Sequence, residues 1–236
     1  MVSTNKILAS AFCLLVSVAA AQTNPGSTTV DVSAQHNRTS AIVSELTLRG
    51  TVPTMFATLV TEASVSGGMA TVNPDCSRGP ESFISLPAGT SFEAALRQLA
   101  EGRSMSESPL RDGVADVFPS SGVPTLLQIR INRFEWYSTT PVRETVARLS
   151  HLPEVSEKAL RLGLTEAPFE GSASAICTRG DCIANQEPAP VLEKAEGATL
   201  LAVLNRVVQA HPRSVWSYSE YRCDEKTLFS LDILAE

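Results

Sequence analysis

Apolar residues recur at helical spacing in four segments of the chain, and each segment follows a threonine. The clearest segment begins at Thr90, which has Glu93 three residues further on, the spacing of a helix-capping box. The apolar residues of this segment lie at i, i+4 and i+7 on one helix face: Phe92, Leu96 and Leu99. The pattern predicts a helix over residues 90–102, with a short strand at residues 83–86 before it.

The same apolar stripe appears after Thr51, after Thr140 and after Thr199. Its members are Val52, Phe56 and Leu59, then Val142, Val146 and Leu149, then Leu200, Leu204 and Val207. We interpret the adjacent glycines Gly67 and Gly68 as the break after the first of these helices. Four similar helices close to strand-like runs predict a unit that is repeated within the chain, with an insertion in the second copy.

Alternation of apolar and polar residues predicts strands in the second half of the chain. Residues 127–131 alternate, and the parity changes near Arg133, after which Phe134 and Trp136 are the apolar positions. This change predicts a bulge or a bend. Residues 215–221 and 228–234 predict a closing hairpin.

These elements predict an α+β protein made of two small modules of mixed β-sheet, with helices packed on one face. Prolines flank a small-residue stretch that predicts a linker at residues 120–125. The linker would separate a module at residues 41–119 from a second module at residues 126–236, which would be a divergent repeat. Residues 22–40 are polar and lack periodicity, so we expect a flexible leader there.

The first 21 residues have the pattern of a signal peptide. Lys6 precedes an apolar stretch at residues 7–20, and Ala19, Ala20 and Ala21 form a small-residue cleavage site. The alternative is an uncleaved membrane anchor, but the apolar stretch is shorter than the ~20 residues of a typical span. Residues 1–21 therefore predict a periplasmic or secreted protein, with no transmembrane segment after cleavage.

The charge balance argues against nucleic acid as a partner. The chain contains 19 Lys and Arg residues against 25 Asp and Glu residues, a net charge of −6. Its basic residues are scattered rather than gathered in a stripe. Proteins that bind nucleic acid concentrate positive charge on one face.

After removal of the signal peptide the chain keeps four cysteines: Cys76, Cys177, Cys182 and Cys223. An even number in an exported protein predicts two disulfides, for which three connectivities exist. Cys177 and Cys182 could pair with each other, which would leave Cys76 for Cys223. The spacing matches no usual zinc site, and we predict no metal or other cofactor.

No catalytic residue can be assigned from the sequence. None of the histidines, which are His36, His151 and His211, lies beside a serine or cysteine in a recognisable nucleophile motif. The alternative function is a small secreted hydrolase whose site is assembled from distant segments.

Four aromatic residues are candidates for partner binding. Trp216 and Tyr218 share one face of a predicted strand, and Phe134 and Trp136 share one face of another. Such pairs pack in a core in many proteins. Alternatively, they form an exposed surface, or lie beside a sheet edge that receives a partner strand.

Three segments of the first module resemble the secretin and TonB short N-terminal domain. They are ELTLRGTVP at residues 45–53, ISLPAGTSFEAALRQL at residues 84–99 and DGVADVFP at residues 112–119. The resemblance implies a periplasmic module that binds other proteins and has no enzymatic activity. In the family this module precedes an outer-membrane secretin or a TonB-dependent barrel, and we recognise neither barrel strands nor a TonB box here. The expected function is thus a stand-alone adaptor whose partner is another envelope protein.

Overall fold

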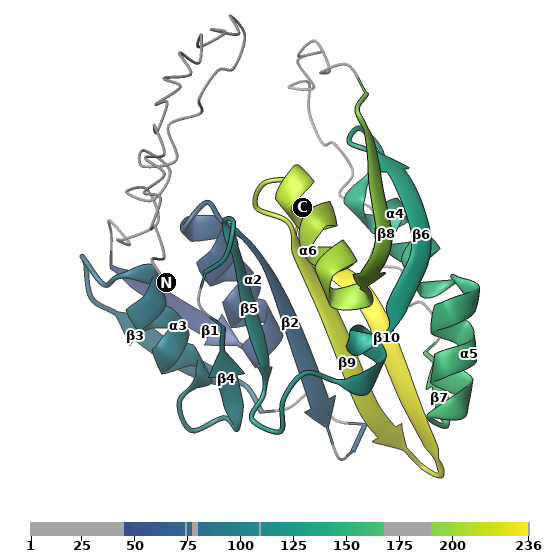
Figure 1. Cartoon of the computed structure of the whole chain (residues 1–236). Coiled ribbons are helices and arrows are strands. Elements are labelled where there is room, and N and C mark those ends of the chain that lie inside the picture. Colours follow the sequence, from purple (N-terminus) through teal and green to yellow (C-terminus); the bar gives the residue numbers. More distant parts are fainter. Residues whose placement is uncertain (1–44, 74, 77–79, 109, 168–189, 236) are drawn as a thin grey trace, which may run out of the picture. The chain divides into compact units, whose positions relative to one another are not determined.

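The computed structural model describes residues 45–235, apart from residues 74, 77–79, 109 and 168–189 (Figure 1). The predicted signal peptide, the predicted leader, Cys177 and Cys182 lie outside these residues. In the described part of the chain, five α-helices and ten strands form mixed sheets. The predicted α+β class is confirmed.

The first half contains five strands and two helices. They are β1 (Leu46–Gly50), α2 (Val52–Glu62), β2 (Ser66–Asn73), β3 (Ser82–Leu86), α3 (Phe92–Ala100), β4 (Met105–Glu107) and β5 (Val114–Pro119). The second half begins with a 3-10 turn. Its elements are η1 (Thr125–Gln128), β6 (Arg130–Tyr137), α4 (Val142–Ser150), α5 (Pro153–Arg161), β7 (Leu164–Glu166), β8 (Leu192–Thr199), α6 (Leu200–Ala210), β9 (Val215–Cys223) and β10 (Lys226–Ala235). The four helices that the apolar stripes predict are α2, α3, α4 and α6.

The helix starts follow the predicted signals to within one residue. Thr199 caps α6, and its hydroxyl accepts a hydrogen bond from the backbone N–H of Ala202 (3.2 Å). In α3 the capping residue is Ser91 rather than the predicted Thr90. The Thr90 hydroxyl instead donates to the carbonyl of Pro87 (2.6 Å) and stabilises the turn before the helix.

A six-stranded sheet runs through both halves, in the order β4-β5-β2-β9-β10-β7. The halves join where β2 pairs in parallel with β9, from Gly67 opposite Val215 to Asn73 opposite Tyr221. The predicted linker at residues 120–125 therefore does not separate two sheets, because strands on either side of it lie in the same one. Two further pairs, β1 with β3 and β6 with β8, form separate two-stranded sheets.

The two halves have the same connectivity. In the first half β1 pairs with β3, and β5 lies between an antiparallel β4 and a parallel β2. In the second half β6 pairs with β8, and β10 lies between an antiparallel β9 and a parallel β7. Helix α5 has no counterpart in the first half. This is the arrangement expected of a repeated unit with an insertion in its second copy.

Helices pack on both faces of the shared sheet, in contrast to the predicted packing of helices on one face. Helices α2 and α3 contribute their apolar side chains to a cluster that contains Met69 and Val215. Helices α4, α5 and α6 contribute to a second cluster that contains Ala70 and Trp216. Since neighbouring residues of a strand point to opposite faces, the two clusters lie on opposite sides of the sheet.

The adjacent glycines Gly67 and Gly68 lie inside β2, which corrects their interpretation as a helix break. A Cβ atom on Gly67 would lie 2.8 Å from the Phe56 ring and 2.9 Å from the carbonyl oxygen of Ala115. A Cβ atom on Gly68 would overlap the indole ring of Trp216. Aromatic side chains thus approach the strand closely from both faces, and only glycine leaves room for them.

The predicted change of parity near Arg133 is confirmed in β6. Ile131, Phe134 and Trp136 are buried, whereas Asn132 and Arg133 are both exposed. The register with β8 is the same on both sides of Asn132, with Ile131 opposite Ala198 and Arg133 opposite Glu196, so β6 contains no inserted residue here.

Cys76 and Cys223 form a disulfide, with their Cα atoms 5.0 Å apart and 147 residues between them in sequence. It links the segment after β2 to the end of β9, just beyond Asn73 and Tyr221, the last residue pair between β2 and β9. This is the early-to-late pairing considered from the sequence. Of the described helices, none combines the length and the apolar character that a membrane span requires.

Candidate partner-binding surface

The four aromatic candidates are core residues. Phe134 is 4% exposed, Trp136 1%, Trp216 0% and Tyr218 1%. The rings of Phe134 and Trp136 stack with their centroids 5.5 Å apart. None of the four can contact a partner directly, so the exposed-surface interpretation is wrong and the core interpretation is correct.

The polar atoms of Trp216 and Tyr218 are bonded inside the protein. The Trp216 Nε1–H donates to Oδ1 of Asn205 (2.7 Å), and the Tyr218 hydroxyl donates to Oε1 of Glu220 (2.6 Å). Burial, together with the bond to Glu220, raises the pKa of the Tyr218 hydroxyl. Both side chains are therefore held in the core by packing and by hydrogen bonds.

The closing hairpin is formed as predicted, but it does not offer the expected sheet edge. Strand β9 lies between β2 and β10, so its backbone groups are paired on both sides. The edges of the six-stranded sheet are β4 and β7, each only three residues long. Such short edges are poor templates for an added strand. Local patterns missed this because the partner of β9 comes from the other half of the chain.

The opposite face of β9 and β10 has a different character. Leu228 and Asp232 lie on this face, opposite Tyr221 and Ser217. Its hydroxyl-bearing side chains, including a threonine of β2, form what we name the hydroxyl face: Thr71, Ser217, Ser219, Tyr221 and Ser230. All five residues are half-buried. The hydroxyls of Thr71 and Ser219 share a hydrogen bond across the strands (3.0 Å). Because the five side chains stay partly exposed, another molecule can reach this part of the sheet.

A groove lies where α2 approaches the end of β10. Its volume is about 350 Å³, and it is lined by Thr54, Ala57, Thr58, Thr61 and Glu62 of α2 and by Leu234 and Ala235 of β10. The hydroxyls of Thr58 and Thr61 donate to carbonyls of their own helix, which reduces the polarity of this wall. Leu234 stands where the β9–β10 register shifts and is 39% exposed. The groove thus combines the apolar side chains of Ala57, Leu234 and Ala235 with threonine side chains and one carboxylate, that of Glu62.

Sequence reasoning missed both the groove and the hydroxyl face. Serine and threonine in strands carry no strong local signal, and the groove depends on two elements that are distant in sequence. The one available signal was the alternation of Trp216 and Tyr218 with Ser217 and Ser219. It shows that β9 has one apolar face and one hydroxyl face.

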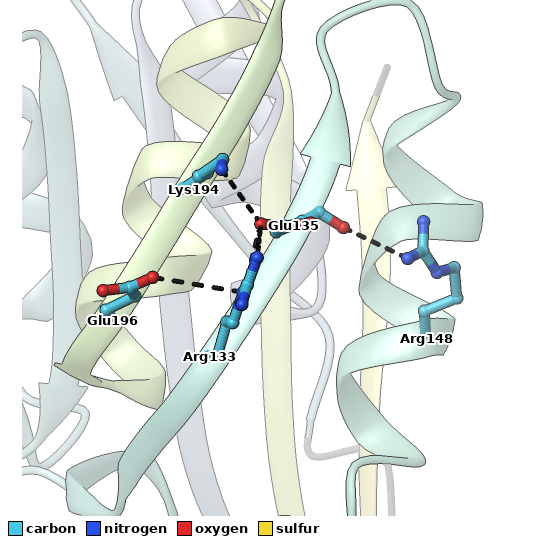
Figure 2. Close-up of polar contacts among 5 residues, drawn as sticks. All are labelled: Arg133, Glu135, Arg148, Lys194 and Glu196. Atoms are coloured by element: carbon cyan, nitrogen blue, oxygen red, sulfur yellow. Dashed lines mark hydrogen bonds and ion pairs between the residues drawn. The ribbon is translucent and has the colours of Figure 1, made fainter.

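A charged cluster lies on the outer face of β6 and β8 (Figure 2). Glu135 Oε1 lies 2.6 Å from Nη2 of Arg133 and 3.3 Å from Nζ of Lys194. Arg133 Nε also lies 4.0 Å from Oε1 of Glu196. The hydrogen bond between Arg133 and Glu135 raises the pKa of the guanidinium and lowers the pKa of the carboxyl.

This cluster serves the fold. Arg148 of α4 donates to the backbone carbonyl of Glu135 (3.1 Å, Figure 2) and lies over the ring of Phe134, 5.5 Å from its centroid. It therefore connects α4 to the strand. The opposite charges compensate one another, and exposed ion pairs of this kind contribute little free energy. We assign no binding role to the cluster.

Three exposed apolar side chains gather at the far end of the same strand pair: Tyr137, Val191 and Leu192. Tyr137 lies opposite Leu192 in the register, and the Val191 N–H donates to the hydroxyl of Ser138 (3.0 Å). Small groups of this kind are common on protein surfaces. They are a weaker candidate than the groove.

The described residues contain one serine–histidine–carboxylate contact, and its geometry differs from that of a catalytic triad. His151 Nδ1 lies 3.5 Å from Ser150 Oγ and 3.5 Å from Glu166 Oε2. A triad uses opposite ring nitrogens for the serine and the carboxylate, whereas both contacts here involve Nδ1. The Ser150 hydroxyl is buried and donates to the carbonyl of Ala147 (3.0 Å).

No group of three or more His, Cys, Asp or Glu residues in the described ranges is arranged to hold a metal ion. His211 lies at the end of α6, where its backbone N–H donates to the carbonyl of Val208 (3.1 Å), and His36 lies outside the described residues.

The fold and its surface define a class, an α+β protein with a disulfide-linked sheet shared by two similar halves. Comparison of the chain with models of protein families, with curated protein sequences and with solved structures gave no match. The function therefore has to be argued from the surface itself.

Proposed function

We propose that this protein is an exported, non-catalytic module of the cell envelope that binds another protein through the hydroxyl face and the adjoining groove. The observation that carries the proposal is the half-exposed sheet face on β9 and β10, next to a groove of about 350 Å³ between α2 and β10. An accessible sheet face beside a helix wall can accommodate a segment of a partner protein.

Two features support export. The pattern of residues 1–21 is typical of a signal peptide. The Cys76–Cys223 disulfide is of a kind that persists in the periplasm or outside the cell, where the environment is oxidising. We propose the periplasm, or secretion, as the location.

The resemblance to the secretin and TonB short N-terminal domain supports a docking role. Of the resembling motifs, the Glu-Ala-Ala-Leu run that begins at Glu93 lies on α3, and Pro119 is the last residue of β5. The resemblance implies binding to another envelope protein, and we propose such a protein as the partner.

The test is capture of envelope proteins by the purified protein and by four arginine variants. Ser219→Arg blocks the hydroxyl face, and Thr58→Arg blocks the groove. The matched controls are Ser85→Arg on strand β3 and Ser156→Arg on helix α5, which are exposed elsewhere. We expect the two surface variants to lose capture by about tenfold or more, the range of central interface residues. Both controls should retain it.

Two outcomes would contradict the proposal. One is that Ser219→Arg and Thr58→Arg, shown by circular dichroism to be folded, capture the same partners as the unmodified protein. The other is a hydrolytic activity that is lost on substitution of His151 or His211, which would favour the alternative of a secreted hydrolase.

A further inference from the structure

The carboxyl group of Asp116 lies in the contact between the two halves. Asp116 is on β5, is 9% exposed and belongs to the first half. Its Oδ2 accepts a hydrogen bond from Nδ2 of Asn205 on α6 (2.7 Å), and Asn205 in turn accepts from Nε1 of Trp216 on β9 (2.7 Å). Two hydrogen bonds therefore connect a carboxyl of the first half to the central tryptophan of the second.

The second oxygen of this carboxyl has no matching donor. Asp116 Oδ1 is buried, and the described residues provide no hydrogen-bond partner for it. An ionised carboxylate loses more hydration energy on burial than a neutral carboxyl. The site therefore favours the protonated form of Asp116.

The surrounding charges compensate only in part. On β4, Glu107 is directed to Arg97 of α3 (3.7 Å), and on β2 the residue opposite Asp116 is Gly68, which has no side chain. On α6, Arg206 donates to the carbonyl of Lys194 (3.5 Å), away from the carboxyl.

Two groups favour ionisation of Asp116: the hydrogen bond from Asn205 and the positive charge of Arg111. Burial outweighs both and raises the pKa of Asp116 to about 6. The carboxyl is thus poised to change its charge between mildly acidic and neutral pH.

We propose that Asp116, buried where β5 meets α6, makes the stability of the joined halves sensitive to pH: the fold is most stable when this carboxyl is protonated, and ionisation of the buried carboxyl destabilises it. A carboxyl whose pKa is higher in the folded than in the unfolded protein stabilises the fold fully below its unfolded pKa, here 3.8. That contribution is lost as the pH rises through about 6. The inference is independent of whether the hydroxyl face binds a partner.

The experiment compares urea unfolding of the full, disulfide-bonded protein with that of Asp116→Asn between pH 4 and pH 7.5. Asparagine has the same shape and no charge. We divide the unfolding equilibrium constant of the unmodified protein by that of the variant. This ratio should rise by about 50-fold from pH 4 to pH 7.5, because only the unmodified protein has a carboxyl that ionises at residue 116. The control Glu107→Gln, a change of an exposed carboxylate on the neighbouring strand, should show no such rise centred near pH 6.

A second measurement decides the question if Asp116→Asn does not fold. Carbon NMR of the side-chain carboxyl in the unmodified protein should show Asp116 titrating near pH 6. A midpoint near pH 4, or a ratio of unfolding constants that stays constant with pH, would overturn the proposal.

Discussion

At the scale of single residues, Gly68 determines how closely the halves approach. It lies on β2, and the space that a side chain would need is occupied by the indole of Trp216. The indole cannot simply turn away, because its N–H is bonded to Asn205 and its ring is fully buried. The joint between the halves therefore depends on the absence of one methyl group.

Gly68→Ala should lower the free energy of unfolding by about 3 kcal/mol, at the upper end of the range for overpacked cores. Urea unfolding of the variant and of the unmodified protein at the same pH measures this difference in free energy. The same substitution in a Trp216→Phe background should cost less, because the smaller ring leaves room, and such non-additivity indicates direct contact. A loss below about 0.5 kcal/mol in the unmodified background, the level of a surface change, would show that Trp216 does not pack on Gly68.

The fate of the aromatic residues shows what residue patterns can predict. Alternation correctly places Trp216 and Tyr218 on one face of a strand. It does not reveal whether α6 covers that face, since burial depends on contacts between segments that are distant in sequence. The pattern therefore placed these two side chains on the same face correctly, but that face is buried.

At the scale of elements, local signals predicted the helices well. Apolar stripes and hydroxyl caps depend on residues within two turns of one another, so the sequence contains them directly. Strand β2 was harder. Its adjacent glycines have low strand propensity. Glycine is needed at these two positions because the rings of Phe56 and Trp216, which belong to other elements, pack directly on them.

Leu96→Ala should destabilise the protein by about 2–5 kcal/mol, the range for a buried leucine. Leu96 lies on the buried face of α3, in the cluster that also contains Leu86 and Val117. The control is Gln98→Ala on the exposed face of the same helix, which should change the stability by less than about 0.5 kcal/mol. Equal effects of the two changes in urea unfolding would mean that the buried face of α3 is misassigned.

At the scale of the whole molecule, the sheet joins two similar halves whose helices lie on opposite faces. The α+β class follows from the mixture of helical and alternating patterns. The strand order does not, because β2 and β9 are far apart in sequence and neither carries a local mark of its partner. The same order of strands leaves one face of β9 and β10 half-exposed and so creates the candidate surface.

The Cys76–Cys223 disulfide should stabilise the joined halves substantially. It closes a long loop, with 147 residues of sequence separation, and loss of such a bond typically costs about 2–5 kcal/mol. The double variant Cys76→Ser/Cys223→Ser avoids an unpaired thiol and should unfold at lower urea concentration than the oxidised protein. Identical midpoints would mean that these cysteines do not form the bond in solution.

The central claim is that the hydroxyl face and its groove receive a partner protein. Its most direct test is photo-cross-linking in intact cells, with a photoreactive side chain placed at Ser219 or Thr58 and, as controls, at Ser85 or Ser156. Our account predicts the same cross-linked partner from Ser219 and from Thr58, and none from the two controls. A partner that cross-links to Ser85 or Ser156 and not to Ser219 or Thr58 would place the binding surface elsewhere and contradict the account.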